Sequence, residues 1–199
     1  MDISQERIRQ ERIAALQADI DAIQDQITTI TTDIDNLTNE KNNAIEKKNK
    51  LQEIKEDSTL LLTETKALID NFNYNVTACS DNINGLAKSH ESISNSNIGS
   101  NSGDSNVQKV ADLSKSIANN LKGMSTSISD MKKNIDSNID EKNKNLEDII
   151  NNAQKKITIL TTQIDNLTKQ IEAKNKELEA KNKELETKKA ELQQYILYF

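Results

Sequence analysis

Residues 92–106 read SISNSNIGSNSGDSN and divide the sequence into two long helical arms. Serine, asparagine and glycine dominate this stretch, and such residues compete with the hydrogen bonds of a helix through their side chains or their flexibility. The segments on both sides carry isoleucine and leucine at helical spacing. The stretch therefore predicts a polar hinge between an N-terminal arm over residues 1–91 and a C-terminal arm over residues 107–199.

The composition favours long helices packed side by side over a globular core. The 199 residues include no proline, no tryptophan and four glycines, with 29% charged and 3% aromatic residues. A proline inside a helix costs about 3 kcal/mol, and aromatic side chains supply much of the bulk of a thick core. We therefore expect an all-α fold, a long antiparallel helical hairpin or coiled coil.

The N-terminal arm carries a sustained heptad pattern. Its apolar residues alternate steps of three and four, as the core positions of a coiled coil do; they are Ile13, Leu16, Ile20, Ile23, Ile27, Ile30, Ile34 and Leu37. A denser group at residues 60–62 widens the apolar surface, which indicates contact with more than one neighbour. The asparagine-rich stretch at residues 71–77 forms helix weakly, so the arm can bend there.

The C-terminal arm begins with one apolar stripe at helical spacing, made of Val107, Val110, Leu113, Ile117, Leu121, Met124, Ile128, Met131 and Ile135. It ends in a heptad tip over residues 164–199. There leucine or isoleucine holds one core position of each repeat, while Lys174, Lys181 and Lys188 hold the other. One apolar residue per heptad makes a weak seam, so we expect this tip to lean on the other arm.

Two similar segments suggest how the arms meet. ITTITTDIDNLTN at residues 27–39 and ITILTTQIDNLTK at residues 157–169 share nine of thirteen residues, and their centres, Asp33 and Gln163, are equidistant from residue 98. If the chain folds back at residue 98, the two segments face each other in antiparallel orientation. Drift within a coiled coil of limited alphabet also explains the likeness, and a parallel homodimer without fold-back remains open.

The charge pattern favours a solvated surface over nucleic-acid or membrane binding. The net charge is −6, and lysines and glutamates are mixed instead of forming a basic face. The sequence shows no run of about 18 apolar residues and no basic-apolar leader. We expect neither a membrane span nor a signal peptide, and a cytoplasmic location or export by a signal-peptide-independent route.

No residue pattern predicts a catalytic, cofactor-binding or metal site. The single histidine, His90, has no ligands at metal-binding spacing, and Cys79 has no neighbouring histidine or cation to activate its thiol. Gly99 and Gly103 are not followed by the Lys-Ser/Thr ending of a phosphate-binding loop. We therefore expect a protein that is not an enzyme.

Two apolar groups are candidates for binding a partner protein. Methionine suits adaptable surfaces, so the first group is the exposed part of the C-terminal arm's stripe: Leu113, Ile117, Met124, Ile128 and Met131. The second is the aromatic end, which is wider than a one-stripe helix can bury: Tyr195, Ile196, Leu197, Tyr198 and Phe199. Alternatively, this end caps the hairpin against Ile3 and Ile8.

The arrangement of the arms resembles a known family. The heptad run IAALQADIDAIQDQI at residues 13–27, the small-residue turn region and the C-terminal Ile/Leu/Lys/Glu heptads are similar to the YwqH-like small helical proteins. These are encoded beside LXG toxins of Gram-positive type VII (ESX) secretion systems and are relatives of the WXG hairpins. The resemblance implies a helical hairpin that pairs with the toxin's N-terminal helical domain and helps its export.

Two features depart from that family's pattern. The chain lacks tryptophan, so the W-x-G turn is missing and Ile98-Gly99 stands in the hinge. The export signal Y-x-x-x-[D/E] is also missing, because Ala78 follows Tyr74 at that spacing and Phe199 follows Tyr195. Within such a family, this chain would be the accessory partner and not the carrier of the signal.

The sequence leaves two classes of function open. The first is a helical adaptor or chaperone-like partner that binds another helical protein, such as the targeting domain of an LXG toxin. The second is a structural coiled coil that assembles with itself as a scaffold or spacer of a phage or cell surface. An adaptor is monomeric or a homodimer by itself, whereas a scaffold forms higher assemblies.

Overall fold

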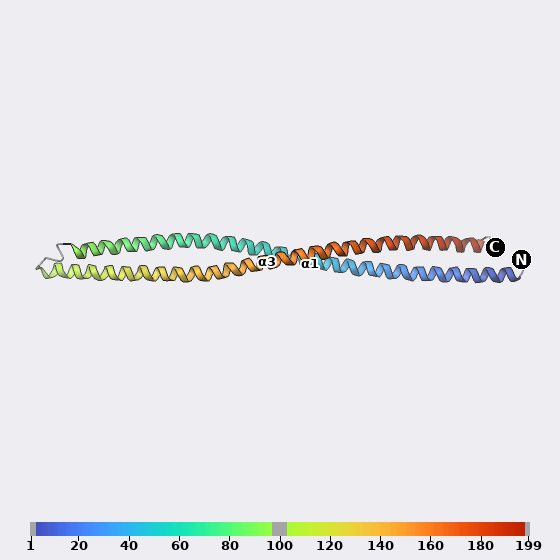
Figure 1. The fold of residues 1–199 in the computed structure, drawn as a ribbon, viewed down its shortest axis with the longest axis horizontal. Helices are drawn as coiled ribbons and strands as arrows, with labels where there is room; N and C mark the ends of the chain where they lie inside the picture. The colour runs from blue at the N-terminus through green and yellow to red at the C-terminus, as the bar shows by residue number, and fades with distance from the viewer. Residues whose placement is uncertain (1–2, 97–102, 198–199) are drawn as a thin grey trace. The chain divides into compact units, whose positions relative to one another are not determined.

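Two long helices account for almost all of the structure, which is a computed structural model and describes residues 3–96 and 103–197. Helix α1 spans Ile3–Asn95 and helix α3 spans Ser105–Leu197 (Figure 1). No strand occurs in these two ranges. The all-α helical hairpin expected from the sequence is confirmed.

The connection between the helices is shorter than the hinge expected at residues 92–106. Helix α1 continues to Asn95. At the other side, the carboxylate of Asp104 accepts a hydrogen bond from the backbone N–H of Asn106 at 2.8 Å. The N-cap of α3 is therefore Asp104, because its carboxylate satisfies a free N–H group of the first turn and interacts favourably with the helix dipole there.

The helices form two compact units, each made of a stretch of α1 and a stretch of α3. Unit 1 comprises Met1–Glu53 with Ala153–Phe199, and unit 2 comprises Ile54–Asn152. The possible bend at residues 71–77 falls in unit 2, where α1 is continuous helix.

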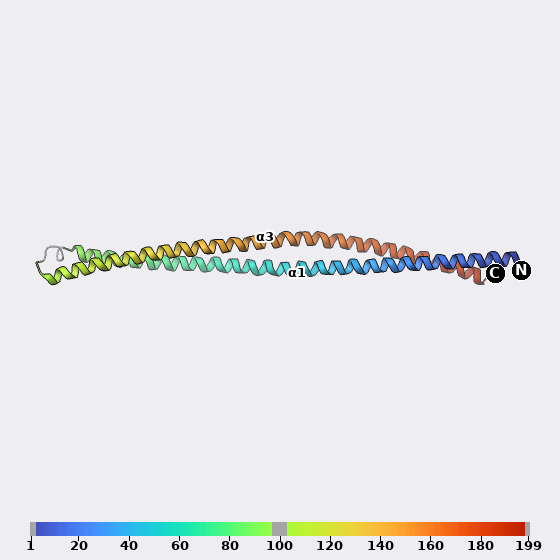
Figure 2. The same cartoon turned by 90° about the horizontal axis from the view of Figure 1, so that it is seen from below.

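In unit 1 the two helices run antiparallel. Lys188 Nζ lies 3.1 Å from the Asp19 carboxylate, and Lys174 Nζ lies 3.1 Å from the Asp33 carboxylate. The two aspartates are fourteen residues apart, and so are the two lysines, in the opposite direction. The start of α1 and the end of α3 accordingly lie side by side in both views (Figures 1 and 2).

The heptad positions of the sequence form the seam of unit 1, meaning the buried and half-buried residues along the contact of the helices. Leu16 is fully buried, and the other residues with little exposure are Ile20, Ile23, Ile30, Ala44, Ala153, Ile157, Leu167 and Leu185. Burial of such a leucine or isoleucine side chain stabilises a fold by about 1.5–3 kcal/mol. The predicted core of both arms is confirmed in this unit.

The lysines of the heptad tip lie half-buried in the seam of unit 1. Their apolar stems run along the seam while their ammonium groups reach carboxylates at its edge. Lys174 meets Asp33 across the seam and Glu177 on its own helix. The hydrogen bond that Lys174 donates to the Asp33 carboxylate is the main cause that raises the pKa of Lys174. In each heptad of the tip, one seam position therefore holds leucine or isoleucine and the other holds a lysine that pairs with carboxylates.

The register expected from the two similar segments is wrong. That register places Asp33 opposite Gln163, whereas Asp33 pairs with Lys174, eleven residues further along α3. Similar sequences have no intrinsic attraction for each other, and the expected register would set Asp19 against Glu177. The observed register instead sets Asp19 against Lys188, so that opposite charges meet at the edge of the apolar layers.

One rung of this charge ladder is incomplete, and filling it should stabilise unit 1. The ladder repeats every seven residues, which puts Gln26 opposite Lys181; in the structure Lys181 pairs with Glu184 of its own helix. We predict that Gln26→Glu raises the free energy of unfolding by roughly 0.2–1 kcal/mol, measured by thermal and urea unfolding at low salt.

The control for this prediction is Gln24→Glu, which adds the same charge at an exposed site of α1 outside the ladder. The advantage of Gln26→Glu over Gln24→Glu should disappear at about 1 M salt, where charges are screened within about 3 Å. Equal stabilities of the two variants at low salt would refute the ladder.

Candidate interaction surface

The seam of unit 2 contains small and polar residues where unit 1 has leucine and isoleucine. Its fully buried residues are Ala87, Ala111, Ser114, Ala118, Ser125 and Asn143. The hydroxyls of Ser80 and Ser125 share a hydrogen bond of 2.9 Å across the seam. Since buried apolar area is the main source of stability, this seam contributes less stability than that of unit 1.

The large apolar residues of unit 2 are half-buried or exposed. The seam holds half-buried Leu62, Ile69, Phe72 and Ile135 among others. Twelve described residues of this kind are exposed. Leu60 and Tyr74 lie elsewhere on α1, and the other ten, with 44–70% of their surface accessible, share one position relative to the seam. These ten are Ile54, Leu61, Leu68, Leu86 and Ile93 on α1, and Val110, Leu113, Met124, Met131 and Ile149 on α3.

Each of these ten residues directly precedes a residue of the seam. Leu61 precedes Leu62 and Met124 precedes Ser125, for example. An α-helix turns about 100° per residue, so residues before the seam lie on one side of it and residues after the seam on the other. Because the helices run in opposite directions, the preceding residues of α1 and α3 lie on the same face of the pair.

The residues that directly follow the seam form the opposite face, which is polar. In the described residues of unit 2, the one exposed apolar side chain among them is Tyr74, which follows half-buried Asn73. Two ion pairs join the helices here: Lys66 Nζ lies 3.1 Å from the Glu147 carboxylate, and Lys122 pairs with Glu91. Since all four residues follow a seam residue, the ion pairs confirm that the following residues of both helices share a face.

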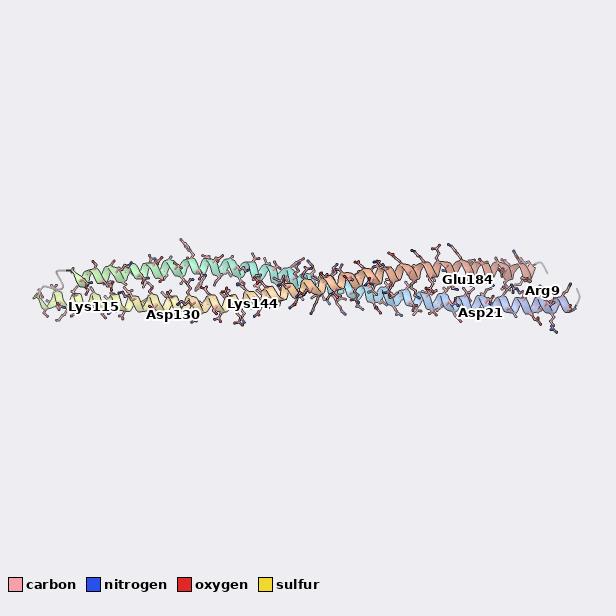
Figure 3. All side chains as sticks on the ribbon, in the orientation of Figure 1. Arg9, Asp21, Lys115, Asp130, Lys144 and Glu184 are labelled. Carbon is pink, nitrogen blue, oxygen red and sulfur yellow. The ribbon has the colours of Figure 1, made fainter. Side chains whose placement is uncertain are left out.

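The two faces of unit 2 differ in charge as well as in polarity. Fourteen charged residues occupy the following positions, among them Lys115 and Lys144, which Figure 3 labels on α3. The preceding positions hold three, Asp57, Glu64 and Lys142. We call the ten exposed residues the apolar face of unit 2. Asparagines and serines stand between the ten residues on this face, and exposed apolar residues gathered on one face make it a candidate interaction surface.

The apolar face begins where unit 2 begins. On α1 one heptad position, directly before the seam, is occupied in unit 1 by polar residues, namely Arg12, Asp19, Gln26, Asp33, Glu40 and Lys47. In unit 2 the same position is occupied by Ile54, Leu61 and Leu68. On α1 the apolar face therefore begins with a change from polar to apolar residues at this position.

The structure divides the stripe predicted along residues 107–135 into two sets. Leu113, Met124 and Met131 are exposed on the apolar face. Ile117 and Ile128 are half-buried at the seam. The expectation of one stripe is therefore wrong, because residues such as 124 and 125 belong to different sides of the helix. The residues of the face on α1 were not predicted from the sequence, although the leucines at 60–62 indicated contact with more than one neighbour.

The C-terminal end of α3 is tied to α1 within unit 1. Arg9 Nε donates to the Tyr195 carbonyl at 3.1 Å and Arg9 Nη2 to the Ile196 carbonyl at 3.4 Å. The guanidinium of Arg12 lies 6.0 Å from the centroid of the Tyr195 ring. Ile196 and Leu197 are exposed, and Tyr198 and Phe199 lie outside the described residues. Tyr195 thus takes part in capping the hairpin.

Other features of the described residues do not add a chemical site. They include no group of three or more His, Cys, Asp or Glu side chains placed to hold a metal ion. Neither described helix contains a stretch apolar and long enough to cross a membrane. Two open hollows on α3, around Leu178 and Leu167, are lined by that helix alone. His90 is half-buried in the seam of unit 2.

Comparisons with known proteins return no relative. No protein-family model, curated protein or solved structure matches the chain. The fold and the surface define the class: a two-helix coiled coil whose unit 2 has one apolar face with few charges.

The difference between the two seams predicts a difference in local stability. In dilute protein, we expect backbone amides at residues 16–37 of unit 1 to exchange with solvent at least about tenfold more slowly than those at residues 58–90 of unit 2, because local opening is cheapest where few apolar contacts are lost. Hydrogen exchange read by mass spectrometry measures this. Equal protection in both ranges would contradict the assignment of a weak seam to unit 2.

The contacts of Arg9 predict that this residue holds the end of α3. In Arg9→Ala the last carbonyls of α3 lose a charged donor, which should cost about 1 kcal/mol and speed amide exchange over residues 192–197. Arg7→Ala is the matched control, because Arg7 pairs with Glu11 of its own helix. If Arg7→Ala frays the end of α3 as much as Arg9→Ala does, the capping role is refuted.

Proposed function

We propose that the chain is a non-enzymatic helical adaptor that binds another helical protein through the apolar face of unit 2. The observation that supports this proposal most directly is the placement of large apolar residues: unit 1 holds most of them in its seam and exposes four of those described, whereas unit 2 exposes ten on one face. Exposing them is costly for an isolated hairpin. A partner that covers them recovers this free energy.

The shape of the apolar face suits a helical partner. Its two stripes follow neighbouring antiparallel helices of unit 2, and an amphipathic helix binds along such a surface through apolar residues at every third or fourth position. Met124 and Met131 lie within it, and methionine side chains adapt to the shape of what they contact. The polar face keeps its ion pairs and its contact with water.

The partner that we propose is the N-terminal helical targeting domain of an LXG toxin exported by type VII secretion. Support comes from the resemblance to YwqH-like hairpins and from the missing Y-x-x-x-[D/E] signal, which leaves the signal to the partner. In this proposal the adaptor acts in the cytoplasm, or leaves with the toxin by a route that needs no signal peptide.

A self-assembling scaffold is the second candidate function. An open assembly needs two surfaces per chain. Exposed Ile196 and Leu197 at the end of α3 supply a second apolar group besides the face of unit 2. A scaffold would form assemblies of many chains by itself, whereas the adaptor forms small species and a complex of one-to-one composition.

Co-expression with the targeting domain of an LXG toxin from the same genome tests the adaptor. We predict that the wild-type chain co-purifies with this domain in equal amounts and that Met124→Lys/Met131→Lys reduces the recovered partner at least about tenfold, because two charges would be buried in an apolar contact. Mass photometry or light scattering gives the composition of the complex.

The matched control is Asn119→Lys/Thr126→Lys. It adds the same two charges with the same seven-residue spacing on α3, at exposed positions of the polar face, and should leave the complex intact. The proposal is overturned if no complex forms, or if the control variant and the apolar-face variant lose the partner equally. Assemblies of many wild-type chains without any partner would favour the scaffold.

A further inference from the structure

We infer that a second copy of this chain covers the apolar face of unit 2 when no other partner does, so that two unit 2 hairpins pack face to face as four helices. The inference rests on the apolar face assigned under the proposed function, but it does not require the toxin partner. A dimer of the chain would compete with the partner for the same face. Partner binding would therefore depend on the concentration of the chain.

The first argument is that the apolar face carries few charges that could repel a second copy. The chain carries a net charge of −6, so two copies repel each other wherever charged surfaces meet. Along the apolar face, the positions before the seam carry no charge over residues 68–93 and 106–138. They hold apolar residues, asparagines, serines and Cys79. Two copies can therefore approach through this face without bringing like charges together.

The second argument is symmetry. A two-fold contact uses the same surface on both copies, so residue i meets residue j and residue j meets residue i. The apolar face has five large apolar residues on α1 and five on α3, in helices that run in opposite directions. Rotating a copy by 180° about an axis through this face therefore puts an apolar stripe opposite an apolar stripe.

The third argument is area. Each of the ten side chains is about half exposed, which corresponds to roughly 50–80 Å² of apolar surface per residue. Together they offer about 500–800 Å² per copy, and a stable interface buries about 800 Å² per partner. With the neighbouring asparagines and serines the face reaches the lower end of that class. We therefore expect a reversible dimer that a better-fitting partner displaces.

Unit 1 offers no equivalent surface. Its position before the seam on α1 carries Arg12, Asp19, Asp33, Glu40 and Lys47, and covering these would remove charges from water. Most of its large apolar residues lie in its own seam, and the exposed ones among its described residues, Ile8, Ile159, Ile196 and Leu197, do not form a stripe along the helices. Self-association should therefore occur through unit 2.

Sedimentation of the full chain over a range of concentrations tests the inference. We expect the mass of the wild type to rise from one chain to two, and Asn119→Lys/Thr126→Lys to behave in the same way. Met124→Lys/Met131→Lys should remain a single chain at concentrations at which the wild type is fully dimeric, with a dissociation constant at least about tenfold higher. Circular dichroism confirms that each variant is as helical as the wild type.

The single cysteine provides a second readout. Cys79 is exposed in the single chain and directly precedes Ser80 of the seam, on the side of the apolar face. The rate of maleimide labelling should fall severalfold as the wild type dimerises, and should stay constant in Met124→Lys/Met131→Lys. The labelling rate therefore distinguishes a dimer that forms through the apolar face from one that forms through another surface.

Three results would overturn the inference. They are a wild type that stays a single chain throughout, an apolar-face variant that dimerises like the wild type, and a wild-type dimer whose Cys79 is labelled at the single-chain rate. If a single chain still binds the LXG targeting domain through Met124 and Met131, the proposed adaptor stands and only the self-association fails. If the dimer forms but the LXG targeting domain does not bind, the self-association stands and the proposed adaptor fails.

Discussion

The antiparallel seam between α1 and α3 is the interaction on which the rest of the structure depends. Two helices that share one seam can bury only the side chains that point into it, so every large apolar residue beside the seam remains in contact with water. In unit 1 most residues beside the seam are charged, polar or small, and some pair across it, as Asp19 does with Lys188. In unit 2 the preceding side is apolar, and the two-helix arrangement leaves it uncovered.

This division assigns different roles to the two units. Unit 1 buries leucine and isoleucine, holds its lysines by ion pairs and fixes the end of α3 through Arg9. Unit 2 buries alanine and serine, and buried side-chain atoms of Asn73, His90, Asp136 and Asn143 have no hydrogen-bond partner among the described residues. Such atoms cost free energy in a core, which adds to the weakness of the seam of unit 2.

The sequence predicted the fold well and the surface only in part. Apolar residues that alternate steps of three and four identified the seam of unit 1, because in a two-helix pair the heptad positions are the ones that face the other helix. The register could not be read from the likeness of residues 27–39 and 157–169, since pairing depends on complementarity, as for Asp33 and Lys174. The split between Met124 and Ser125 needed the structure, because small seam residues do not stand out from a polar background.

The most direct test of the account uses the methionine methyl groups. Met124 and Met131 both lie on the apolar face. With ¹³C-methyl methionine and a soluble paramagnetic agent, the account predicts that the signals of Met124 and Met131 broaden in dilute protein and are protected when the face is covered by a second copy or a partner. Equal broadening of Met124 and Met131 in the free, concentrated and partner-bound protein would contradict it.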